Sequence, residues 1–65
     1  MNAHSLEKKL NRMLYKLYPG QFSVQVTEDS IVVKGLVKIG IRSWMFVKGV
    51  LRKITPYHVV NDIKF

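Results

Sequence analysis

The sequence predicts one small α+β domain with the order α-β-β-α-β, in which two helices pack on one face of a three-stranded mixed sheet. Three observations lead to this fold class. Apolar residues recur at helical spacing in residues 5–18 and 44–54, two β-rich segments joined by a short polar turn lie between them, and a third β-rich segment follows the second helix. A chain of 65 residues has room for a single domain, residues 1–65.

The first predicted helix, residues 5–18, is amphipathic. The stripe that we expect to face the core consists of Leu6, Leu10, Met13, Leu14 and Leu17. Ser5 is a candidate N-cap, Glu7 in the first turn suits the helix dipole, and Pro19-Gly20 predicts the end of the helix. The polar residues expected on the opposite side and its flanks are Lys8, Lys9, Asn11, Arg12, Tyr15 and Lys16.

A β-hairpin is predicted next. Residues 21–27 alternate, which predicts that one side of the strand is buried: Phe22, Val24 and Val26. The polar turn 28–30 then leads at once into residues 31–37, so these two strands should pair antiparallel. In the second strand the residues expected to face the helices are Ile31, Val33 and Val37, and Gly35 predicts either a bulge or a close approach by a helix.

The second predicted helix, residues 44–54, has an apolar side and a basic side. Ser43, at the end of the connection 38–43, is its candidate N-cap, and Thr55-Pro56 predicts its end. The apolar side comprises Trp44, Val47, Val50, Leu51 and Ile54, with Phe46 at its boundary. Residues 59–65 then form a strand, which should run parallel to the second strand because a helical crossover joins them.

The charge of the chain indicates the kind of partner. Eleven Lys and Arg against four Asp and Glu give a formal charge of +7, which favours anionic partners such as nucleic acid or an acidic membrane surface, although solubility alone would also explain it. The absence of cysteine excludes disulfides and thiolate zinc sites. Without an apolar leader or a long apolar stretch, the sequence predicts a cytoplasmic protein, with peripheral membrane attachment as an option.

Catalytic, metal and cofactor sites are not expected. The histidines, His4 and His58, lack a convergent ligand set, and a surface position is the simplest interpretation of both. The four carboxylates are scattered over a helix start, a turn and a strand, so no acid–base pair is visible. We therefore expect a non-enzymatic protein with no cofactor and no bound metal.

Two segments resemble a known family. Residues 30–37, an apolar run that closes in Gly35 and then Val37, resemble a strand of BON domains, and Val59-Val60-Asn61 with the residues after it resembles their closing strand. The order of elements and the length also agree, so the likeness covers nearly the whole chain. It departs from the family at Thr55-Pro56-Tyr57-His58, where a Gly-Val pair is usual, and in the bulky residues 44–46. The resemblance implies a non-enzymatic module associated with phospholipid surfaces or with multidomain assemblies.

Three functional hypotheses follow. The leading one is a BON-like binding or assembly module that contacts an anionic surface, such as phospholipid, or a protein partner through Lys8, Arg12, Lys16, Arg42, Lys48, Arg52 and Lys53. The second is a nucleic-acid-binding protein that contacts phosphates, although the predicted open sheet face lacks the stacking aromatics of an RRM. The third is a small phage or host factor that docks on a protein, or on a second copy as a homodimer, through Val32, Leu36 and Val60.

Overall fold

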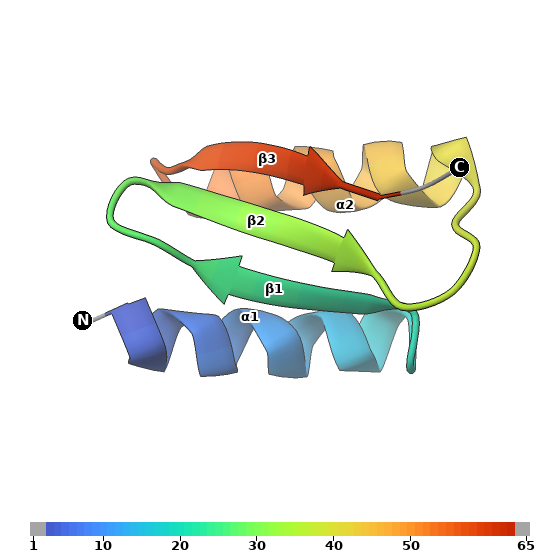
Figure 1. Cartoon of the computed structure of the whole chain (residues 1–65), viewed down its shortest axis with the longest axis horizontal. Coiled ribbons are helices and arrows are strands. Elements are labelled where there is room, and N and C mark those ends of the chain that lie inside the picture. Colours follow the sequence, from blue (N-terminus) through green and yellow to red (C-terminus); the bar gives the residue numbers. More distant parts are fainter. Residues whose placement is uncertain (1–2, 64–65) are drawn as a thin grey trace.

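The computed structural model describes residues 3–63 and has the predicted order of elements (Figure 1). The elements are α1 (Ala3–Leu17), β1 (Phe22–Val26), β2 (Ser30–Gly35), α2 (Ile41–Ile54) and β3 (His58–Asp62). The α+β class, the two helices and the three-stranded mixed sheet are thereby confirmed. The last strand ends at Asp62, and residues 64 and 65 of the longer strand that was predicted lie outside the described residues.

The sheet has the order β1-β2-β3, with β2 in the centre. β1 and β2 pair antiparallel, with Val24 beside Val33, and β2 and β3 pair parallel, with Val32 beside Val60. Both pairings agree with the prediction. The parallel pair is possible because α2 carries the chain back to the starting end of β2 before β3 begins.

One apolar core lies between the sheet and the two helices. The alternation of β1 and β2 directs one set of side chains inward, while α1 and α2 each contribute part of an apolar stripe. Figure 1 shows α1 running alongside β1 and α2 lying behind β3. The buried residues are Leu10, Leu14, Phe22, Val24, Val26, Ile31, Val33, Ile39, Trp44, Val47 and Leu51.

Helix α1 supports the edge of β1 with polar side chains. Asn11, which was predicted to face away from the core, instead donates from Nδ2 to the carbonyl of Val24 (3.0 Å) and accepts the N–H of Val24 at Oδ1 (2.8 Å). Glu7 accepts the N–H of Val26 at Oε1 (2.9 Å). The side of α1 that carries Glu7 and Asn11 therefore faces the outer edge of β1 and bonds three backbone groups that β2 does not pair.

The start of α1 differs from the prediction and its end agrees with it. The helix begins at Ala3, so Ser5 lies within the first turn and is not the N-cap, and Glu7 lies beyond that turn. After Leu17 the chain makes a β-turn in which the N–H of Gln21 donates to the carbonyl of Tyr18 (3.2 Å). Gly20 has φ of +71°, which with the preceding proline corresponds to a type II turn and requires glycine at that position.

Helix α2 begins earlier than predicted. Its N-cap is Gly40, with no capping side chain, so the proposal that Ser43 caps the helix is wrong. Trp44 is buried as expected. Three residues predicted to face the core are exposed, each near the end of its element or just beyond it: Leu17 (45%), Val37 (53%) and Ile54 (53%).

Gly35 marks a close approach and not a bulge, since the β1–β2 register continues through it. A Cβ atom at this position would lie 3.0 Å from Cγ1 of Ile39 and 3.3 Å from Cγ2 of Ile63. The approaching side chains therefore come from the connection before α2 and from the end of β3, and not from a helix as predicted. Glycine lets both side chains cover the end of the core.

Candidate functional site

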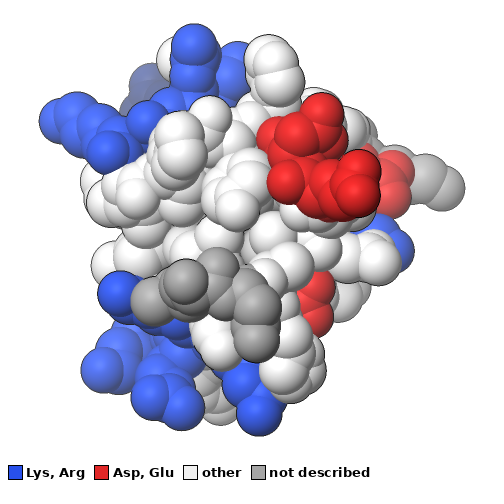
Figure 2. Space-filling model, turned by 90° about the vertical axis from the view of Figure 1, so that its left-hand side faces the viewer, with Lys and Arg blue, Asp and Glu red and all other residues white. Residues whose placement is uncertain are grey.

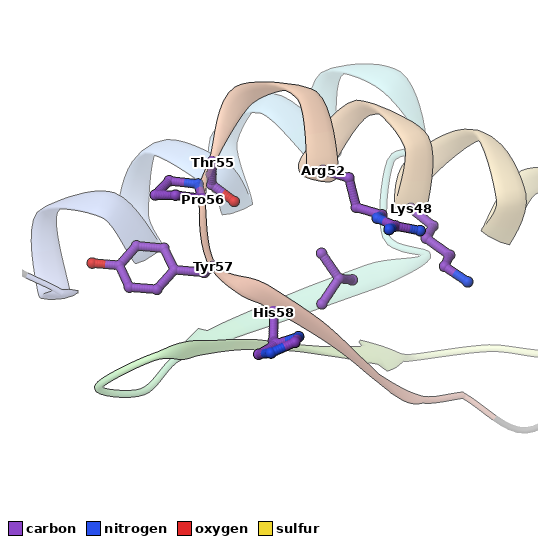
Figure 3. Close-up of a pocket in the computed structure, with 7 residues that line it drawn as sticks. Lys48, Arg52, Thr55, Pro56, Tyr57 and His58 are labelled. Carbon is purple, nitrogen blue, oxygen red and sulfur yellow. The ribbon is translucent and has the colours of Figure 1, made fainter.

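A hollow of about 480 Å³ lies between the last turns of α2 and the start of β3 (Figure 3). Lys48 and Arg52 extend from one side of α2, and His58, the first residue of β3, lies below them. The ring of Tyr57 points away from the two basic side chains. The lining residues are Lys48, Arg52, Thr55, Pro56, Tyr57, His58 and Val59.

The end of α2 fixes the geometry of this hollow. Thr55, which is only 8% exposed, donates to the carbonyl of Leu51 with its N–H (3.1 Å) and with its hydroxyl Oγ1 (3.0 Å). Its backbone is extended and Pro56 follows, so the helix cannot continue and the chain turns toward the sheet. The N–H of His58 then donates to the carbonyl of Asp29 (3.2 Å), which attaches the start of β3 to the hairpin.

The hollow has the charge of an anion-binding site. Lys48 and Arg52 are four residues apart and therefore lie on the same side of α2, and no carboxylate is among the lining residues. Arginine presents a planar fork of donors and lysine a mobile ammonium, a combination suited to phosphate oxygens. Both were among the cations predicted from the sequence to bind a partner, whereas Thr55, Tyr57 and His58 were not.

The remaining predicted cations are exposed and lie elsewhere on the two helices. Lys8, Arg12 and Lys16 are on α1, and Arg42 and Lys53 are on α2 outside the hollow. Figure 2 shows Lys and Arg in two main groups on one face, at the heights of α2 and α1, with uncharged surface between them and acidic side chains to one side. On this face the structure therefore divides the predicted cations between two surfaces.

An exposed apolar pair continues the line of the hollow cations along α2. Ile41 (56% exposed) and Met45 (64% exposed) precede Lys48 and Arg52 at spacings that place all four on one outer stripe of the helix. We call these four residues the α2 stripe. Phe46, 52% exposed, lies on a different side of α2, about 130° around the helix from the stripe, and contacts the ring of Tyr18 edge-on, with 6.3 Å between centroids. The apolar half of this stripe was not predicted, because Ile41 was placed in the connection 38–43 and Met45 was not among the residues of the predicted apolar side.

The predicted apolar interface is only partly assembled. Val32 and Val60 are register partners on the open face of the sheet, with Val60 43% exposed. Leu36 is 59% exposed but follows the last residue of β2. Four residues of extended chain separate Leu36 from Val32 by roughly 13 Å, so the three side chains do not form one compact patch.

Residues 3–63 contain no cluster of three or more His, Asp or Glu side chains that could hold a metal. Every buried side-chain nitrogen or oxygen in this part of the chain has a hydrogen-bond partner. Neither α1 nor α2 is long and apolar enough to cross a membrane.

Comparison with known proteins gives no relative: no family model, curated protein sequence or solved structure matches the chain significantly. The likeness to BON domains therefore stays a resemblance in sequence pattern and order of elements.

Proposed function

We propose that the chain is a non-enzymatic binding module that lays the outer side of α2 on an anionic phospholipid surface. The observation that carries this proposal is the α2 stripe, in which two exposed apolar side chains continue directly into two cations at a hollow. Interfacial helices combine these two chemistries, because apolar side chains enter the headgroup region while cations meet lipid phosphates.

The apolar half of the α2 stripe favours a lipid surface over other anionic partners. Ile41 and Met45 are both more than half exposed. These two large apolar side chains gain little from contact with a phosphodiester backbone, whereas each gains free energy when its apolar area leaves water for the acyl boundary. This difference favours lipid over nucleic acid, which remains the alternative because the phosphate chemistry is shared.

The basic half supplies attraction and orientation. Near an anionic membrane each Lys or Arg contributes about 1 kcal/mol. On the face shown in Figure 2 the acidic side chains lie mainly to one side of both basic groups, so a negative surface would repel that side and favour contact through the side that carries the helix cations. In this arrangement Lys48 and Arg52 take a headgroup phosphate at the hollow.

Vesicle co-sedimentation tests the proposal, with phosphatidylcholine vesicles compared with vesicles that contain phosphatidylglycerol, each at two salt concentrations. We expect salt-sensitive binding to the anionic vesicles only. The double variant Lys48→Glu/Arg52→Glu should weaken binding by roughly 30-fold or more, equivalent to about 2 kcal/mol. The matched control is Lys8→Glu/Arg12→Glu, which changes net charge equally on α1 and should retain most of the binding.

A third variant separates lipid from nucleic acid. Met45→Ser leaves the charge unchanged, so it should weaken vesicle binding and leave any binding to duplex DNA as it was. Equal losses in the α1 and α2 double variants would mean that diffuse charge, and not the α2 stripe, determines binding. Tighter binding to DNA than to anionic vesicles, insensitive to Met45→Ser, would establish the nucleic-acid alternative.

A further inference from the structure

The two edges of the sheet differ in how their backbone groups are satisfied. At the β1 edge, Asn11 and Glu7 of α1 bond the backbone of Val24 and Val26. At the other edge, β3 is the last strand and its residues are exposed or half-buried. Lys48 and Arg52 of α2 lie above the start of this edge at the hollow, but within residues 3–63 no side chain bonds the backbone of Val59. A strand edge with unpaired backbone groups is a template for another strand.

The register of β3 shows which of its groups face outward. The N–H of His58 donates to the carbonyl of Asp29 on the β2 side. In a parallel pair, alternate residues direct their backbone groups to the same neighbour, so His58, Val60 and Asp62 face β2 and Val59 and Asn61 face away. The ladder that a new strand could form is short, because the N–H of Ile63 already donates to Oδ1 of Asn61 (2.8 Å).

The sequence of β3 is complementary to itself in one antiparallel register. If two copies pair about a two-fold axis at Val60, the outward groups of Val59 meet those of Asn61 in the second copy, as an antiparallel ladder requires. On the open face, His58 of each copy then lies opposite Asp62 of the other, which pairs an imidazole donor with a carboxylate.

The same register joins the apolar residues of the open face. Val60 lies beside Val32 within one chain and would lie beside Val60 of the second copy, with Cβ atoms about 4.5–5.5 Å apart. A row of valines would then cross the junction. We propose that the chain forms a homodimer by antiparallel pairing of β3 with β3 of a second copy, centred on Val60.

Electrostatic repulsion between the two copies opposes this dimer. Each copy carries +7, so repulsion opposes pairing, and a single-strand contact buries less than the roughly 1,600 Å² of a standard interface. Dimerisation should therefore depend on concentration and increase with added salt. Binding to anionic vesicles should decrease with added salt, so the opposite salt dependences distinguish the two contacts. His58 and Val59 line the hollow and also belong to the paired edge, so the dimer and the vesicle contact would compete for part of one surface.

Cysteine cross-linking tests the register, since the native chain contains no cysteine. Val60→Cys should give a disulfide-linked dimer under mild oxidation. Gln25→Cys is the control: it is exposed on the same face but lies in β1, so its symmetry mate would be roughly 24 Å away, at five strand spacings. A disulfide requires Cα atoms within about 7 Å. Equal cross-linking of both variants overturns the register.

Analytical ultracentrifugation of the reduced chain tests the dimer itself. We expect a monomer–dimer equilibrium that Val60→Lys shifts at least tenfold toward monomer, with the circular dichroism spectrum unchanged because Val60 is 43% exposed. His58→Asp should weaken the dimer by setting two carboxylates opposite each other, and the swap His58→Asp/Asp62→His should restore it. A strict monomer at high concentration and high salt, or a dimer insensitive to Val60→Lys, refutes the proposal.

Discussion

Replacing Asn11 by alanine should destabilise the fold far more than its position on a helix surface suggests. The substitution removes both hydrogen bonds to Val24 and leaves the N–H and carbonyl of that residue without their partner. Each such bond contributes about 0.5–1.5 kcal/mol net, so the expected loss is about 1–3 kcal/mol. The measured value is a lower limit, since alanine raises helix propensity by several tenths of a kcal/mol.

That loss is large for a chain of this size. With 65 residues the free energy of unfolding should be roughly 3–10 kcal/mol, and each kcal/mol shifts the melting temperature of such a domain by about 4–8 °C. A loss of about 2 kcal/mol therefore lowers the melting temperature by roughly 8–16 °C. Thermal and urea unfolding followed by circular dichroism measure both quantities.

The control for Asn11→Ala is Arg12→Ala, the next residue of α1, which is exposed. Its substitution should change the free energy of unfolding by no more than about 0.5 kcal/mol. If the two variants unfold at the same urea concentration, the bonds from Asn11 to β1 do not stabilise the fold, and our explanation of the covered edge is wrong.

Two glycine substitutions should have opposite signs. Gly49→Ala should raise the free energy of unfolding by about 0.5–1 kcal/mol, because alanine favours a helix and a Cβ atom at this exposed position of α2 would meet nothing within 4 Å. Urea unfolding measures the sign of this change. Gly20→Ala should lower the free energy of unfolding by about 1 kcal/mol or more, because φ of +71° is strained for alanine even though space for a Cβ atom is available. A higher free energy of unfolding in the same urea assay would contradict the type II turn.

The order of elements could be predicted because its signals are local. Alternation gave the buried sides of β1 and β2, Pro19-Gly20 ended α1, and Trp44, Val47 and Leu51 marked the core side of α2. The start of α2 was missed because Gly40 occupies the N-cap without a side-chain bond, so Ser43 was the stronger signal.

Asn11 was misplaced for a different reason. Its position on the helix, away from the apolar stripe, indicated solvent, but a helix that runs beside a strand edge also places its flank against backbone groups. Helical periodicity describes side chains and carries no information on which backbone groups lie nearby. The candidate site could be predicted only in part for the same reason. Helical spacing placed Lys48 and Arg52 on the basic side of α2, but the turn at Thr55 and Pro56 is what brings His58 below them.

The bonds from Glu7 and Asn11 to β1 also determine where self-assembly would stop. Two chains joined at β3 would present only their β1 edges at the ends of the joined sheet, and both of those edges are bonded by α1. Growth would therefore end with the second copy, as in a closed two-fold assembly. Loss of Asn11 would free the N–H and the carbonyl of Val24 at that edge while the bond from Glu7 remains, so the Asn11→Ala variant should associate beyond the dimer more readily than the native chain when it is concentrated.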